Sequence, residues 1–204
     1  MLAEHYPEAH CELNYFVPHE LLIATILSAQ CTDAAVNKAT PALFARFPSP
    51  ADYARATPGD IEPYVKTLGF FRNKARSVHE AMSAVVDRYG GQVPRTMEEL
   101  LTLRGVARKT ANVVLSNAFG MNEGFVVDTH VMRLSRRLGL IGEAEEGDPV
   151  KIERRLTVLF ERADWGLLSH LMIFHGRRAC KARMGACADH PVCRAFGECC
   201  ELPR

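Results

Sequence analysis

The stretch Leu103-Arg104-Gly105-Val106-Ala107-Arg108-Lys109-Thr110 decides the fold that we expect for this chain. Residues 96–103 are predicted to form one helix, residues 104–107 a tight turn and residues 108–119 a second helix. Gly105 lets the backbone turn closely, and the N–H groups at the start of a helix bind anions. A helix–hairpin–helix of this kind can hold a phosphate group, with Arg108 and Lys109 adding positive charge beside it.

The rest of the chain also reads as helix. Helix starts are predicted at Ser49-Pro50, Thr57-Pro58, Thr96 and Asp148-Pro149, where a capping residue precedes a proline or a nearby carboxylate. Glycines such as Gly90, Gly120 and Gly139 are placed as helix stops. No run alternates long enough to indicate a strand, so we predict an all-α fold with a seam near residues 120–124.

Size and charge bound the possible classes of protein. The 204 residues, 48% of them apolar, fit one large domain or two small ones. The net charge is +1, but residues 1–103 hold 9 basic and 12 acidic residues, whereas residues 104–204 hold 16 and 12. This asymmetry is typical of a protein whose more basic half binds a polyanion such as nucleic acid, although a random distribution of charges would also produce it. With no basic leader and no apolar run beyond residues 21–27, we expect a soluble cytoplasmic protein.

A lysine and a carboxylate are the candidate catalytic pair. A lysine at the positive end of a helix dipole, if partly buried, is more readily a neutral nucleophile. Asp128 follows 19 residues after Lys109, behind the apolar Val126-Val127 and at the start of a helix predicted over residues 129–138. Its carboxylate can take a proton from Lys109 and stabilise a cationic sugar. Alternatively, Lys109 only contacts phosphate and Asp128 only caps its helix.

Several segments together resemble the endonuclease III family of the helix–hairpin–helix superfamily, which are DNA glycosylases with abasic-site lyase activity. The resemblance covers nearly the whole chain. It rests on Leu27-Ser28-Ala29-Gln30, Val36-Asn37-Lys38-Ala39-Thr40, Arg108-Lys109-Thr110-Ala111-Asn112, Val127-Asp128-Thr129-His130 and His175-Gly176-Arg177. Related adenine-mismatch glycosylases keep the aspartate but lack the lysine.

The resemblance implies a fold and a reaction. Residues 15–122 would form a six-helix domain with the hairpin, and residues 1–14 with 123–204 an iron–sulfur cluster domain, with the DNA groove between the two. Lys109 would attack C1′ of a flipped, oxidised pyrimidine nucleotide with Asp128 as its partner. The base leaves, a Schiff base forms, and β-elimination cuts the strand. The partner would be double-stranded DNA with damaged bases or abasic sites, bound by a monomer.

Further residues take DNA-binding roles by the same resemblance. Gln30 would fill the gap left by the flipped nucleotide, and Phe70 or Phe71 would wedge the opposite strand, unless the two rings are core. Gly105, Ala107 and Arg108 would bind the backbone, while His130 would orient substrate or cap its helix. Arg104 and Ala107 depart from the family's Leu-Pro-Gly-Val-Gly hairpin, so a strained turn and weaker DNA binding are expected.

Five cysteines crowd the last 25 residues, with the spacing Cys180-x6-Cys187-x5-Cys193-x5-Cys199 and Cys200 adjacent. In an intracellular protein such a cluster indicates metal rather than disulfides, and zinc fits four cysteines. The family carries a [4Fe–4S] cluster on Cys-x6-Cys-x2-Cys-x5-Cys. We therefore expect Cys180, Cys187, Cys193 and Cys199 as ligands around an insertion, with His190 or Cys200 as the alternative ligand. Lys181 and Arg183 either contact phosphate or are solvated charges.

Three other functions remain open from the residues alone. The chain would be a monofunctional mismatch glycosylase if Lys109 were not the nucleophile. It would be a non-catalytic DNA-binding module if the hairpin and the metal cluster had only structural roles. It would be a zinc-stabilised interaction domain if the metal were zinc.

Overall fold

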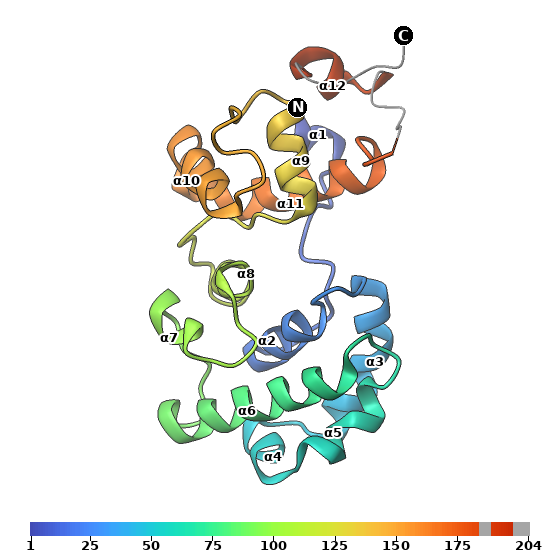
Figure 1. Ribbon diagram of the computed structural model, residues 1–204, viewed down its shortest axis with the longest axis vertical. Coiled ribbons are helices and arrows are strands. Elements are labelled where there is room, and N and C mark those ends of the chain that lie inside the picture. Colours follow the sequence, from blue (N-terminus) through green and yellow to red (C-terminus); the bar gives the residue numbers. More distant parts are fainter. Residues whose placement is uncertain (184–188, 198–204) are drawn as a thin grey trace. The chain divides into compact units, whose positions relative to one another are not determined.

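The computed structural model describes residues 1–183 and 189–197, and each regular element in those two ranges is a helix (Figure 1). The expected all-α fold is therefore confirmed. The chain divides into two compact units. We call Glu12–Met121 the hairpin unit, and Met1–Cys11 with Asn122–Arg204 the terminal unit.

The hairpin unit is built around α2, whose residues from Leu21 to Leu27 are all buried. Helix α2 packs against α6 and α8, while α4 and α5 pack on α6. The helices of this unit are α2 (Pro18–Leu27), α3 (Asp33–Arg46), α4 (Pro50–Arg55), α5 (Pro58–Val65), α6 (Phe71–Tyr89), α7 (Met97–Leu101) and α8 (Arg108–Phe119). Extended backbone at Ala56 separates α4 from α5.

Local sequence explains where these helices begin and end. Capping boxes at Ser49 with Asp52, and at Thr57 with Asp60, open α4 and α5, each with proline in the first turn. Gly90 closes α6 and Gly120 closes α8 in left-handed conformations, as predicted. Helix α7 ends at Leu101 rather than at residue 103.

The terminal unit joins the first residues of the chain to its last helices. It contains α1 (Leu2–His5), α9 (Thr129–Arg137), α10 (Pro149–Leu159), the short 3₁₀ helix η1 (Arg162–Asp164), α11 (Trp165–Arg178) and α12 (Pro191–Phe196). Helix α11 packs against α9 and α1. Tyr6 lies buried against Leu171 and Phe174 of α11, so the N-terminal segment forms part of this core.

The second core of this unit contains two cysteines of the predicted metal site. Cys180 and Cys193 are both buried in it, together with Phe125, Val131 and Met172. Within the described residues, no helix is both long and apolar enough to traverse a bilayer.

Candidate functional site

The hairpin between α7 and α8 is packed onto the core of its unit. Leu103 and Val106 bury their side chains on either side of the turn. Gly105 lies between them with φ +79°, a left-handed conformation that glycine adopts without strain. A Cβ built at Gly105 would lie 3.1 Å from Ser77 Cβ and 3.3 Å from Ile26 Cγ2. The turn therefore requires glycine both for its backbone angle and for its close approach to α6 and α2.

The two departures from the family hairpin do not strain the turn. Ala107 has φ −97° and ψ 171°, extended backbone open to any residue, so the expected need for a left-handed glycine there is wrong. Arg104 stands in the place of the family's proline. Its guanidinium forms an ion pair with Glu80 at 3.2 Å and a hydrogen bond to Asn73 Oδ1 at 3.4 Å, both on α6. Arg104 thus gives the hairpin side-chain contacts to α6 at the position where the resemblance implies a proline.

Lys109 occupies the first turn of α8, directly behind the hairpin. Ala107 is the N-cap and has no side-chain oxygen to accept a hydrogen bond from the first turn. An anion can occupy that position instead, and the partial positive charge of the helix end favours one. Lys109 is exposed, so the partial burial expected from the sequence is not observed. Arg108 is exposed beside it and increases the positive charge.

Gln30 and Phe70 are the two non-glycine residues with positive φ in the described part of the chain, at 55° and 57°. Gln30 lies in the loop after α2, and Phe70 is the N-cap of α6. Both are exposed, Phe70 to 71%, whereas Phe71 is half-buried. Core packing is therefore excluded for Phe70. Non-glycine residues held in the left-handed backbone region, at positive φ, cluster at functional sites.

A buried lysine connects these two loops. Lys74 is 5% exposed, and its Nζ donates to Cys31 Sγ at 2.8 Å, one residue after Gln30. The backbone N–H of Lys74 donates to the Phe70 carbonyl at 3.0 Å. The sequence does not reveal this pair, because Cys31 in the loop after α2 and Lys74 on α6 lie 43 positions apart. It ties the Gln30 loop to the start of α6.

Asp128 is the N-cap of α9 in the terminal unit. Its Oδ1 accepts hydrogen bonds from the backbone N–H groups of His130 at 2.8 Å and Val131 at 2.9 Å. Both bonds end on Oδ1, so the cap does not require the second oxygen. Val126 and Val127 before it are buried, as predicted. Lys109 belongs to the hairpin unit and Asp128 to the terminal unit.

The ring of His130 is enclosed by α11 and by Arg133. Gly176 lies so close that a Cβ there would be 2.9 Å from His130 Cβ. Arg133 Nη2 contacts His130 Nδ1 at 3.1 Å and donates to the Gly176 carbonyl at 2.9 Å. Burial lowers the pKa of His130. The side chain is thus oriented beside Asp128, and its burial favours the neutral form of the ring.

Two of the predicted metal ligands, Cys180 and Cys193, lie within the described residues, whereas Cys187, Cys199 and the alternative Cys200 lie outside them. Arg137 Nη1 donates to Cys180 Sγ at 3.1 Å, and Arg133 donates twice to the Cys180 carbonyl. His175 Nε2 contacts Cys193 Sγ at 3.1 Å. Lys181 and Arg183 are exposed. Buried thiols beside cationic and N–H donors are suited to exist as metal-bound thiolates.

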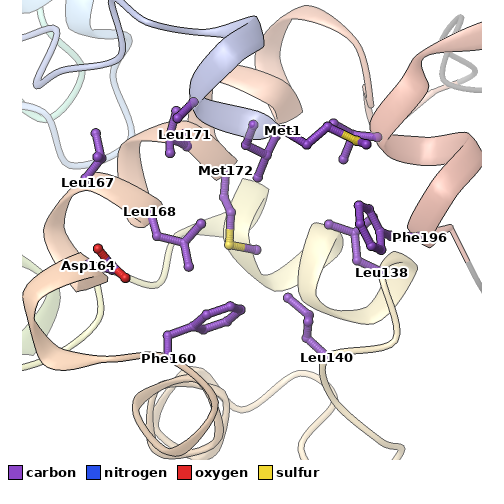
Figure 2. Close-up of a pocket in the computed structure, with 13 residues that line it drawn as sticks. Met1, Leu138, Leu140, Phe160, Asp164, Leu167, Leu168, Leu171, Met172 and Phe196 are labelled. Carbon is purple, nitrogen blue, oxygen red and sulfur yellow. The ribbon is translucent and has the colours of Figure 1, made fainter.

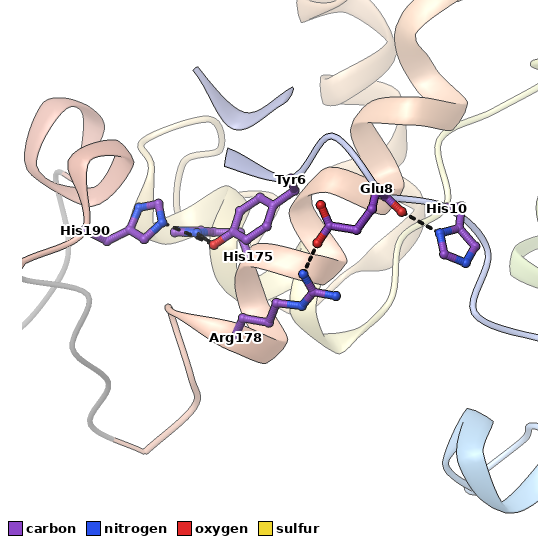
Figure 3. A network of polar contacts seen from close by, with 6 residues as sticks. All are labelled: Tyr6, Glu8, His10, His175, Arg178 and His190. Carbon is purple, nitrogen blue, oxygen red and sulfur yellow. Dashed lines mark hydrogen bonds and ion pairs between the residues drawn. The ribbon is translucent and has the colours of Figure 1, made fainter. Parts of the chain in front are cut away.

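A second polar group adjoins Cys193 and was not anticipated. Tyr6 Oη lies 3.0 Å from His175 Nδ1 and 3.2 Å from His190 Nε2, as Figure 3 shows. Burial lowers the pKa of His175 to about 4 and also lowers that of His190. Ligand atoms of His175, His190 and Cys193 lie within 4.8 Å of one another. Tyr6 and His175 are 169 positions apart, so no spacing in the sequence could reveal their contact.

The terminal unit also contains a cavity of about 510 Å³ (Figure 2). Its walls are almost entirely apolar, and among the described residues that line it only Asp164 has a charged side chain. A cavity without converging polar groups has no means to bind a charged substrate or to move a proton. Of the predicted site residues that lie within the described ranges, none lines it. The apolar walls include Leu138, Leu140, Phe160, Leu168, Met172 and Phe196.

Comparison with known proteins places the chain in a family. Residues 23–162 match the HhH-GPD superfamily of base excision DNA repair proteins. Endonuclease III of Synechocystis sp. is 51% identical over 93% of this chain and 85% of its own length. Endonuclease III of Bacillus subtilis is 41% identical over 94% of this chain and 86% of its own length.

The three-dimensional comparison agrees with the sequence. A solved structure of a trapped endonuclease III–DNA covalent intermediate, an estranged-adenine complex, superposes with a TM-score of 0.90. It is 42% identical and covers 97% of this chain and 91% of that one. With the hairpin, the lysine behind it and these matches over nearly its whole length, the chain belongs to the endonuclease III family of HhH-GPD base excision repair proteins.

Proposed function

We propose that this protein is a base excision repair enzyme that removes oxidised pyrimidines from duplex DNA and then cleaves the strand at the abasic site, acting as a monomer. The observation that carries the proposal is Lys109 in the first turn of α8, behind a hairpin that presents backbone N–H groups. A solved relative at 42% identity contains a trapped covalent intermediate with DNA, which supports covalent chemistry. A lysine amine is the side chain that forms an imine with a sugar carbon.

In the proposed reaction the neutral amine of Lys109 attacks C1′ of the damaged nucleotide. The C–N bond to the base breaks, and the base leaves with the bonding pair and a proton. The sugar ring then opens as the nitrogen forms a Schiff base with C1′. Loss of a C2′ proton expels the 3′ phosphate by β-elimination, and water releases the enzyme. The exposed position of Lys109 allows access to a nucleotide flipped out of the duplex.

Asp128 is the proposed partner in this chemistry. Its Oδ1 accepts two backbone hydrogen bonds, which fix the carboxylate without using its second oxygen. A fixed carboxylate can accept a proton from the lysine and stabilise positive charge on the sugar as the base departs. His130 beside it, whose burial lowers the pKa of the ring, would orient the substrate.

The remaining predicted residues are proposed to hold the DNA. The N–H groups around Gly105, Ala107 and Arg108 would bind a backbone phosphate. Gln30 and Phe70 both project from exposed, left-handed positions, as residues that enter a disrupted base stack would need to. Phe71 is half-buried and is a weaker candidate for the wedge. Lys181 and Arg183 are exposed and would contact phosphates nearby.

We further propose that Cys180, Cys187, Cys193 and Cys199 hold a [4Fe–4S] cluster. The residues present fit such a group. Cys180 and Cys193 are buried, and Arg137 and His175 each direct a nitrogen at one of their sulfurs. Fe–S clusters are bound by thiolates whose sulfurs accept hydrogen bonds. The cluster would fix the fold around the last helices and could exchange electrons, and none of the steps above depends on it.

The experiment that tests the function is borohydride trapping on duplexes that contain an oxidised pyrimidine or an abasic site. Wild-type protein should cross-link to both, and Lys109→Gln should lose the cross-link and the strand cleavage while still binding the duplex. Lys66→Gln is the matched control, because Lys66 is also exposed and lies at the end of α5 in the same unit. Cross-linking of Lys109→Gln at the wild-type level would show that another amine is the nucleophile.

A further inference from the structure

The polar contacts around Cys193 form one chain with a defined direction. The backbone N–H of Val192 donates to His190 Nδ1 at 3.3 Å, so that nitrogen carries no proton. The proton of the His190 ring must then be on Nε2, which lies 3.2 Å from Tyr6 Oη and donates to it. The hydroxyl of Tyr6 consequently donates to His175 Nδ1 at 3.0 Å.

The last contact of the chain reaches a sulfur. With Nδ1 of His175 accepting from Tyr6, the proton of this ring is on Nε2, which lies 3.1 Å from Cys193 Sγ. Each side chain in the series therefore accepts one hydrogen bond and donates the next. The backbone N–H of Val192 can only donate, so it sets the direction of the whole series. We call Val192 N–H, His190, Tyr6 and His175 the sulfur relay (Figure 3 shows its three side chains).

We propose that the sulfur relay is an outer shell of the metal site, in which Tyr6 fixes His175 as a hydrogen-bond donor to Cys193 and His190 is a relay member rather than a metal ligand. The inference rests on the proposed cluster and deepens it. It assigns Cys193 as a ligand and gives the N-terminal segment a role at a site built by the end of the chain. The spacing of the cysteines leaves that choice open.

A hydrogen bond to a ligating sulfur changes the charge that the sulfur carries and therefore the properties of the bound cluster. An N–H that points at a thiolate stabilises its negative charge, and it stabilises a reduced cluster more than an oxidised one. Outer-shell partners of this kind strongly affect metal affinity. The relay is also sheltered, because His175 is fully buried and Tyr6 is 6% exposed. Hydrogen bonds in such surroundings are costly to leave unmade.

Tyr6→Phe is the sharpest test, because it removes one hydroxyl and leaves the ring in place. Without that hydroxyl the tautomer of His175 is no longer fixed, and Nε2 need not donate to the sulfur. We expect the variant to fold and to hold wild-type iron, to lose metal to a chelator about tenfold faster, and to show a more negative reduction potential. Tyr15→Phe is the control. It removes a hydroxyl that donates to the Asn117 carbonyl at 3.1 Å in the hairpin unit, and both readouts should stay unchanged.

His190→Ala distinguishes a relay member from a ligand. As a relay member, His190 can be removed with retention of four irons and with a shift of the potential in the same direction as in Tyr6→Phe. Loss of iron in His190→Ala would overturn the assignment. A Tyr6→Phe variant whose potential and metal-loss rate match those of wild type would show that the relay does not act on Cys193.

The outcomes also separate the relay from the proposed function. If the protein contains zinc instead of iron, the proposed cofactor is wrong, and the rate of metal loss from Tyr6→Phe still tests the relay. If Lys109→Gln remains active, the proposed nucleophile is wrong, and the metal readouts are unaffected because they do not require turnover.

Discussion

Replacing Gly105 by alanine tests the packing of the hairpin, and its cost can be worked out from the structure. At φ +79° an L side chain costs about 1–2 kcal/mol relative to glycine. The added Cβ would meet Ser77 Cβ at 3.1 Å and Ile26 Cγ2 at 3.3 Å, both parts of a packed interior. Overpacking of this kind costs typically 1–3 kcal/mol. We expect a loss of about 3 kcal/mol, equivalent to a fall in Tm of roughly 6–12 °C for a chain of this size.

Two control variants separate the contributions. Gly90→Ala introduces a side chain at φ +59° with no atom within 4 Å of the new Cβ, so it reports the backbone cost alone. Ala107→Gly should change stability by less than about 1 kcal/mol, because Ala107 already has extended backbone and glycine is accepted at an N-cap. Thermal unfolding measures all three variants, and binding to a duplex with an abasic-site analogue at low temperature measures the anion site.

The result that would refute this reasoning is an equal fall in Tm for Gly105→Ala and Gly90→Ala. The hairpin would then not be packed against α2 and α6 as described. If Gly105→Ala lowers Tm but the variant binds the duplex as tightly as wild type, the packing explanation still holds. The hairpin would then not be part of the DNA-binding surface.

Two further changes concern the terminal unit. Asp128→Asn should keep the free energy of unfolding within about 1 kcal/mol of wild type, because asparagine caps a helix about as well as aspartate. Single-turnover base release should fall strongly, and parallel losses of stability and activity would instead indicate a role in capping alone. Burial lowers the pKa of His130 in the folded protein below its usual 6.5. As pH falls below 6.5, the imidazole of His130 is therefore protonated in the unfolded chain before it is protonated in the folded one, and the free energy of unfolding decreases. The drop in Tm between pH 7.5 and pH 5 should be smaller in His130→Gln than in wild type, and identical drops would contradict the buried neutral state.

Much of the fold is determined by interactions between residues close together in the chain, and this part can be predicted from the sequence. Capping boxes at Ser49 and Thr57, the cap at Asp128 and the glycine stops at Gly90 and Gly120 all act within a few residues of their own helix ends. The helix of Lys109 was predicted with its observed bounds for the same reason. Hydrogen bonds between neighbours in the chain depend only on the residue types and their order.

Contacts between distant segments could not be read in this way. The conformation of Ala107, the ion pair of Arg104 with Glu80 and the exposure of Lys109 depend on how the hairpin lies against α6. The Lys74–Cys31 contact and the approach of Tyr6 to His175 join residues 43 and 169 positions apart. The sequence by itself determined the all-helical fold, many of the helix starts and stops, and the residue types that the chemistry needs. The tertiary structure decided which buried polar groups meet, because satisfying a buried hydrogen bond is a property of the packed interior and not of any one segment.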